Sequence, residues 1–257
     1  MSYNREEQKA IMESNILKLY PEQSECFNKI MDSINGNAEN NLFYVDGIGG
    51  AGKTFLYSTI LAAVRSSGSL ALAAASSGVA ALLLPGGQTG HSLFKIPLKV
   101  DEYSTCSISK QSMQAKLLKH AKVIIWDEAP LMHKHVYEAL DRTLQDIKGN
   151  GKLFGGITTV FGGDIRQILA VIPKASPEEI RSSVISQSAF WPMVTIFKLS
   201  KNMRLFSDYQ ESFIVAKRQY AEFILNIGEG KIEENMNGDI RIPDQYLYQD
   251  NLESLIN

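Results

Sequence analysis

The stretch Gly47-Ile-Gly-Gly-Ala-Gly-Lys-Thr54 decides the fold of this chain. It matches the phosphate-loop pattern G-x-x-x-x-G-K-[ST], follows a short run of strand formers at residues 42–45, and precedes a predicted helix. Such glycines let successive backbone N–H groups turn toward one phosphate chain, while the following helix adds its positive end. The predicted nucleotide-binding residues of the loop are Gly47, Gly49, Gly50, Ala51, Gly52, Lys53, Thr54 and Phe55.

Two side chains of this loop have specific expected roles. Lys53 should reach the β- and γ-phosphates of ATP and act in catalysis, and the Thr54 hydroxyl should bind Mg²⁺. An ordinary glycine-rich turn is the alternative interpretation.

An acidic pair, Asp127-Glu128, follows a second predicted strand at residues 123–126. Acidic residues at the carboxyl end of a buried strand point into the crevice where parallel sheets bind ligands. We expect Asp127 to hold the metal through its water shell and Glu128 to polarise the attacking water as general base. Alone, such a pair is commonly a helix N-cap, but its place downstream of a phosphate loop favours an ATPase.

Short apolar runs alternate with helical patterns along the rest of the chain. An amphipathic helix is predicted after Pro21, and further strands are predicted at residues 70–75, 158–161 and 194–197. This alternation predicts an α/β fold with a parallel sheet covered by helices on both faces. Another helix, with apolar residues from Phe213 to Ile227, precedes a polar tail.

Two more polar motifs follow predicted strands. Gln167 lies in Gly162-Gly-Asp-Ile-Arg-Gln167. Its side chain could orient the water that attacks the γ-phosphate, or could couple the presence of the γ-phosphate to the DNA-binding side of the domain. Arg204, in Leu199-Ser-Lys-Asn-Met-Arg204, could stabilise charge on the transferring phosphoryl group. The alternative for Gln167 is an ordinary polar residue of a turn, and the alternative for Arg204 is an ordinary surface arginine.

The composition excludes several classes of protein. The formal net charge is −2, so the chain has no overall positive field that would indicate a polyanion partner. Any DNA-binding surface must therefore be a local one. Cys26 and Cys106 form no C-x-x-C pair, which argues against a zinc site or a disulfide framework. The longest apolar stretch, residues 70–84, is too short to span a bilayer, and the polar N-terminus does not match a signal peptide.

Together these motifs resemble the Pif-type helicases of superfamily one, which move 5′ to 3′ on DNA. Residues 19–23 resemble that family's Q motif, and the segments at 47–54, 75–97, 126–130, 162–173 and 199–205 resemble its motifs I, Ia, II, III and IV. Trp126, Ala129-Pro130 and Phe94-Lys-Ile-Pro97 look closest to the branch that includes helicases of Helitron transposons. The resemblance implies a RecA-like domain in which Gln23 hydrogen-bonds the adenine edge and Arg204 contacts the γ-phosphate.

The resemblance also places single-stranded DNA along one face of the domain. Backbone amides at the turn before the helical stretch at residues 79–84 could hold a DNA phosphate, with a plain capped helix as the alternative. His133 and His135 are two residues apart and should face different ways on a helix, which disfavours a metal pair. The candidate DNA-binding residues are Ser76, Ser77, Gly78, Thr89, His91 and Ser92.

Some positions depart from the family pattern. Ile48 and Ala51 replace residues that are usual in the loop, and the chain ends about where the resemblance places a second motor domain with motifs V and VI. We divide the chain into an N-terminal helical segment with the Q motif at 1–40, a RecA-like ATPase domain at 41–206, and a helix and linker at 207–257.

We therefore predict the first motor domain of an ATP-dependent 5′–3′ DNA helicase, weakly active when isolated, with ATP and Mg²⁺ as cofactors and single-stranded DNA as partner. Repair, recombination or telomere and replication maintenance are its expected settings. The alternatives are another phosphate-loop machine, such as a helicase loader, and a nucleotide- or DNA-binding domain that does not unwind. We expect a monomer without a membrane partner, nuclear or mitochondrial in a eukaryote and otherwise cytoplasmic.

Overall fold

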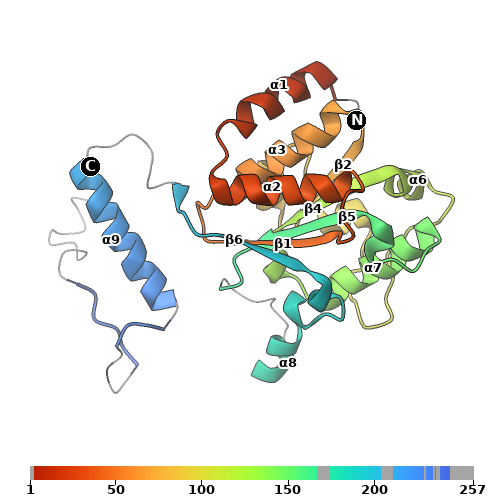
Figure 1. Ribbon diagram of the computed structural model, residues 1–257. Helices are drawn as coiled ribbons and strands as arrows, with labels where there is room; N and C mark the ends of the chain where they lie inside the picture. Colours follow the sequence, from red (N-terminus) through yellow and green to blue (C-terminus); the bar gives the residue numbers. More distant parts are fainter. Residues whose placement is uncertain are drawn as a thin grey trace, which may run out of the picture. The chain divides into compact units, whose positions relative to one another are not determined.

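The centre of the protein is a sheet in which all strand pairs are parallel (Figure 1). The computed structural model describes residues 3–166, 174–203, 211–228, 230–233, 235 and 238–243. In these residues six strands lie in the order β3-β2-β4-β5-β1-β6. They are β1 (Leu42–Gly47), β2 (Leu70–Ala75), β3 (Gln88–Thr89), β4 (Ala121–Asp127), β5 (Thr158–Gly163) and β6 (Thr195–Leu199).

Helices cover both faces of this sheet, as the sequence predicts. Figure 1 shows the first three helices on one side of the sheet and α7 on the other. The helices are α1 (Arg5–Ile16), α2 (Pro21–Ile34), α3 (Lys53–Ser66), α4 (Gly78–Leu83), α5 (Gly90–Phe94), α6 (Met113–His120), α7 (Lys134–Lys148), α8 (Pro177–Ser182) and α9 (Glu211–Gly228). Short 3₁₀ turns lie at Ala129–Leu131, Leu153–Gly156, Ile185–Gln187 and Trp191–Met193.

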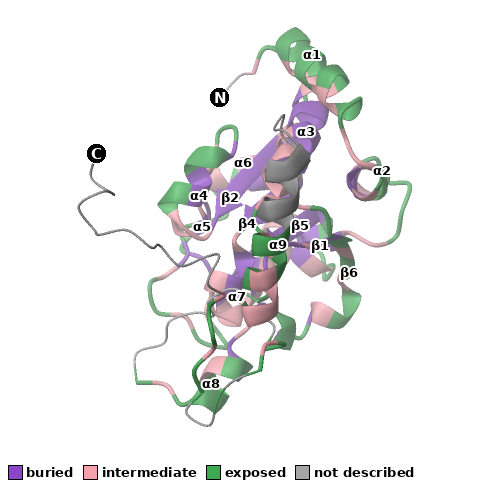
Figure 2. Ribbon diagram, turned by 90° about the vertical axis from the view of Figure 1, so that its left-hand side faces the viewer, coloured by how far each residue is buried: buried purple, intermediate pink, exposed green. Residues whose placement is uncertain are grey.

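Two hydrophobic cores result, one on each face. The first joins α2, α3 and α4 to the sheet through residues such as Phe27, Ile60 and Val123. The second joins α5, α6 and α7 to the other face around the fully buried Trp126 and Tyr137. Figure 2 accordingly shows β2 and β4 largely in the colour of buried residues, whereas α1, which has no buried residue, is largely exposed. The alternation of side chains along each strand assigns its residues to the two cores.

The chain divides into two compact units, Met1–Arg204 and Leu205–Asn257. The sheet and the helices α1 to α8 belong to the first unit, and α9 belongs to the second. None of the helices in the described part of the chain combines the length and the apolarity that crossing a bilayer requires.

Candidate nucleotide-binding site

The phosphate loop connects β1 to α3 in the order that the sequence predicts. Gly50 and Gly52 have φ angles of 85° and 80°, which glycine adopts without the steric cost of a side chain. Gly52 is the N-cap of α3, and its carbonyl accepts the amide of Leu56 at 3.1 Å. The glycines thus bend the chain sharply so that the first turn of α3 begins with Lys53 and Thr54.

Lys53 lies folded over its own loop. Its ammonium donates to the Gly47 carbonyl at 2.5 Å and contacts the Ile48 carbonyl at 3.4 Å. These carbonyls hold the cation at the mouth of the loop, where phosphate oxygens would compete for it.

Gln23, on the first turn of α2, contacts the phosphate loop directly. Its amide nitrogen lies 3.4 Å from the Ala51 carbonyl oxygen and 3.3 Å from that of Gly52, while its amide oxygen accepts the Tyr20 amide at 3.0 Å. The side chain is buried. Both ends of the amide are therefore engaged, and the contact with an adenine edge stays a prediction.

The two acidic residues lie at the carboxyl end of β4, on the same edge of the sheet as the loop. Asp127 is buried, and its carboxylate accepts the amide of Glu128 at 2.9 Å. Burial raises the pKa of Asp127, whereas the hydrogen bond from the Glu128 amide and the charge of Lys53 act to lower it. Lys53 follows the end of β1 and Asp127 ends β4, and the carboxyl ends of these parallel strands lie at one edge of the sheet.

Glu128 has a strained backbone. Its φ of 55° and ψ of 39° place a non-glycine residue in the left-handed region, where strain is common at functional sites. Burial raises the pKa of its carboxyl, and the charge of Asp127 raises it further, while Lys53 opposes the shift. A carboxylate whose pKa is raised toward neutrality is suited to accept a proton from water.

The side chains at this edge of the sheet include oxygen donors of the kind that bind a divalent cation. Asp127 supplies a carboxylate, and Thr54 supplies a hydroxyl from the first turn of α3; both are ligand types that Mg²⁺ prefers. The described residues contain no group of three or more His, Cys, Asp or Glu side chains that could hold a metal by themselves.

Two later segments approach the loop from neighbouring strands. The amide of Met203 donates to the Gly50 carbonyl at 2.8 Å, so the chain after β6 is tied to the phosphate loop. After β5, the carboxylate of Asp164 accepts the amide and side chain of Arg166 at 3.1 and 2.8 Å. Sequence reasoning assigned no role to Met203 or Asp164. The predicted Gln167 and Arg204 lie outside the described residues.

Most of the candidate DNA-binding residues make local structural contacts. The Ser76 amide donates to the Asp127 carbonyl, and its hydroxyl accepts the Trp126 indole N–H at 3.0 Å. Ser77 caps α4, and Thr89 caps α5 by accepting the amide of Ser92 at 3.3 Å. Gly78 and Ser92 are exposed, whereas His91 is half-buried. A phosphate at this turn would therefore be held by amides beyond Ser76.

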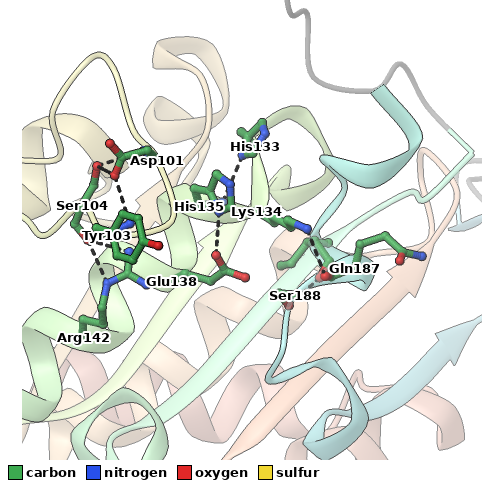
Figure 3. Close-up of polar contacts among 11 residues, drawn as sticks. Asp101, Tyr103, Ser104, His133, Lys134, His135, Glu138, Arg142, Gln187 and Ser188 are labelled. Carbon is green, nitrogen blue, oxygen red and sulfur yellow. Dashed lines mark hydrogen bonds and ion pairs between the residues drawn. The ribbon is translucent and has the colours of Figure 1, made fainter. Parts of the chain in front are cut away.

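A polar cluster at the start of α7 differs from expectation (Figure 3). His133 and His135 do not face different ways; their ring centres lie 4.4 Å apart. The reason is that His133 is the N-cap, with extended backbone, and its Nδ1 accepts the His135 amide at 3.1 Å. His135 Nδ1 in turn contacts the Glu138 carboxylate at 2.7 Å. Burial lowers the pKa of His133, which favours the neutral, accepting form.

Comparison with known proteins adds independent findings. A sequence model of the family described as PIF1-like helicase matches residues 18–238. The ATP-dependent DNA helicase RRM3 of Saccharomyces cerevisiae is 28% identical over 209 residues, which cover 79% of this chain and 28% of that protein. The ATP-dependent DNA helicase PIF4 of Trypanosoma brucei brucei is 30% identical over 132 residues, 49% of this chain and 16% of that protein. The chain thus spans less than a third of the length of either relative.

Solved structures show the same fold. The crystal structure of Bacteroides Pif1 bound to ssDNA matches with a TM-score of 0.66 and 25% identity, over 84% of this chain and 47% of that chain. The Pif1 helicase of Candida albicans matches with a TM-score of 0.65 and 21% identity, over 88% of this chain and 45% of that chain. These likenesses confirm the predicted RecA-like architecture.

Proposed function

The chain belongs to the PIF1-like helicase family, and from this premise we propose that it is the first motor domain of an ATP-dependent DNA helicase moving 5′ to 3′. The observation that carries the proposal is the meeting of the phosphate loop with Asp127 and Glu128 at one edge of a parallel sheet. In open parallel sheets this edge is the place where ligands bind.

The proposed ATP site assigns one role to each described side chain. Lys53 binds the β- and γ-phosphates, and Thr54 and Asp127 hold Mg²⁺, directly and through its water shell respectively. When bound, Mg²⁺ would neutralise charge on the phosphates. Glu128 accepts a proton from the attacking water, for which its partly buried carboxyl and raised pKa suit it.

Two further roles fall on residues outside the described part of the chain. Gln167 would link the γ-phosphate to the DNA side, and Arg204 would stabilise the charge of the transferring phosphoryl group. The hydrogen bond between Met203 and Gly50 supports the second role, because it fixes the residue just before Arg204 on the phosphate loop.

Single-stranded DNA is the proposed macromolecular partner, and the similar Bacteroides Pif1 is itself bound to ssDNA in its crystal structure. The proposed contacts are the exposed Gly78 and Ser92 together with the capped turns of α4 and α5. Repair, recombination or replication and telomere maintenance would be the setting. The compartment would be nuclear or mitochondrial in a eukaryote and cytoplasmic in a bacterium.

Phosphate release and DNA binding test this function. The chain should hydrolyse ATP slowly with Mg²⁺ and bind an oligothymidine weakly, with an affinity that falls steeply between about 50 and 200 mM salt. An absence of both nucleotide binding and hydrolysis would overturn the proposal. Duplexes with a 5′ or a 3′ tail test the polarity: unwinding of the 3′-tailed substrate alone would contradict the assigned direction.

A further inference from the structure

Strand β5 ends in two glycines, and a tyrosine hydroxyl lies near the place of each missing side chain. A Cβ atom on Gly162 would lie 1.5 Å from the Tyr57 hydroxyl oxygen. A Cβ atom on Gly163 would lie 3.4 Å from the Tyr44 hydroxyl oxygen. Because neighbouring residues of a strand point to opposite faces, the two phenols reach the end of β5 from opposite sides of the sheet.

Tyr57 comes from α3, one helical turn after Lys53. Its side chain is fully buried, and among the described residues its hydroxyl has no hydrogen-bond partner. A buried donor without an acceptor destabilises a fold, whereas a phenylalanine of nearly the same shape would avoid the cost. The hydroxyl at this position therefore points to a role outside packing.

The strand register brings Asp127 close to this hydroxyl: Trp126 of β4 pairs with Phe161 of β5, so Asp127 follows beside Gly162 on the neighbouring strand. Burial raises the pKa of Tyr57 well above its usual value, and the charge of Asp127 raises it further. The alternation of side chains agrees with this: Val123 and Ile125 of β4 belong to the same core as Tyr57, so Asp127 points to that face as well. The phenol thus lies at the glycine-lined end of the sheet on the side of the Asp127 carboxylate.

Building on the proposed function, we propose that Tyr57 is a positioning residue for Asp127, whose carboxylate accepts a hydrogen bond from the phenol when it takes up Mg²⁺. In this structure the carboxylate accepts the amide of Glu128, and an ionised carboxylate can accept several further hydrogen bonds. The additional donor fixes the orientation of the carboxylate, so that the water shell of the cation meets a preorganised acceptor. Gly162 is required because any larger residue would displace the phenol.

The test compares Tyr57→Phe with the wild-type chain in binding of a fluorescent ATP analogue over a range of Mg²⁺ concentrations. Loss of an outer hydrogen bond at a metal site weakens metal affinity about 10- to 100-fold when the partner is a direct ligand. Because Asp127 acts through the water shell, the half-saturating Mg²⁺ concentration should rise by about the lower of these factors. Binding without Mg²⁺ should stay unchanged. The Tm of the nucleotide-free variant should stay equal or rise, because an unpartnered buried hydroxyl is removed.

Tyr44→Phe is the matched control. It also deletes a buried phenol oxygen that has no hydrogen-bond partner among the described residues, but Tyr44 packs in the core on the opposite face. Its half-saturating Mg²⁺ concentration should equal that of the wild type.

Other results would contradict either the positioning role of Tyr57 or the proposed function. An unchanged Mg²⁺ dependence in Tyr57→Phe, or the same shift in Tyr44→Phe, overturns the positioning role. A large fall in Tm overturns it too, since the hydroxyl would then be a structural group. If the wild-type chain bound no nucleotide at any Mg²⁺ concentration, the proposed function would fail and this inference with it.

Discussion

Gln23 and Gly52 are joined by a hydrogen bond of 3.3 Å in which the glutamine amide nitrogen donates to the glycine carbonyl. The same amide nitrogen lies 3.4 Å from the Ala51 carbonyl, and the amide oxygen accepts the backbone N–H of Tyr20. One buried amide therefore ties the start of α2 to the phosphate loop. A residue that the family resemblance assigns to base recognition also supports the loop that holds the phosphates.

Gln23→Ala should loosen this connection. Removal of the side chain leaves the Tyr20 amide and the two loop carbonyls without these partners, which costs about 1–3 kcal/mol of stability. The affinity for ATP should fall more than that for GTP, because the predicted contact with the adenine edge is lost together with the support of the loop. Thermal unfolding and parallel titrations with the two nucleotides measure these effects. Equal losses for both nucleotides would show that the side chain supports only the loop, which binds the phosphates common to both.

Glu128→Gln should separate binding from chemistry. The variant keeps the shape of the side chain but removes the proton acceptor, so hydrolysis should fall about 10²- to 10⁴-fold while Mg²⁺-ATP binding persists. Single-turnover phosphate release measures the loss.

Glu138→Gln is a matched control on α7, where the carboxylate pairs with His135 rather than facing the nucleotide. It should hydrolyse ATP at the wild-type rate. Wild-type turnover in Glu128→Gln would refute the assignment of the base.

His133 should make stability depend on pH. Its pKa is lowered in the folded state, chiefly by burial, so the unfolded chain binds more protons as the pH falls through the ordinary value of about 6.5. Its contribution to stability is therefore present above that value and is lost as the pH falls toward the lower, folded-state pKa. Protonation also removes the acceptor that caps α7.

His133→Asn keeps a capping oxygen that does not titrate. Denaturant unfolding of both chains between pH 7.5 and 5.5 should show a smaller loss of stability in the variant, because its capping side chain does not titrate. Parallel curves for the two chains would contradict the role of His133.

Local signals in the sequence predicted most of the fold. The strands predicted at 42–45, 70–75, 123–126, 158–161 and 194–197 correspond to β1, β2, β4, β5 and β6, whose ends differ by up to two residues. Each is a short run of strand-forming residues bounded by polar or glycine residues. The two-residue strand β3 carries too short a pattern to be found. Helix α1 lies within the helical segment predicted at 1–40, but it buries no residue, so no buried apolar stripe marks its ends in the sequence.

The sequence predicts the site residues that belong to a local motif. It does not indicate the residues whose role depends on contacts between distant parts of the chain. Lys53, Thr54, Asp127 and Glu128 come together because the carboxyl ends of parallel strands share one edge. The approach of Tyr57 to Gly162, and of Met203 to Gly50, joins residues far apart in the chain, and no local pattern indicates it. His133 was misread because helical spacing does not apply to an N-cap residue in extended conformation.

The central claim is that the phosphate loop binds ATP through Lys53, whose ammonium now lies 2.5 Å from the Gly47 carbonyl. A hydrogen bond to a charged group contributes about 1.5–3 kcal/mol, and each 1.4 kcal/mol is tenfold in affinity. Lys53→Ala should keep its fold, because the side chain is only partly buried and the loop backbone is unchanged.

Calorimetric titration of Mg²⁺-ATP into the wild-type chain and Lys53→Ala tests this claim most directly. We predict saturable binding to the wild type and an affinity at least tenfold weaker for the variant, with equal Tm values for the two chains without nucleotide. Equal affinities in two folded chains, or no binding to the wild type, would contradict the account.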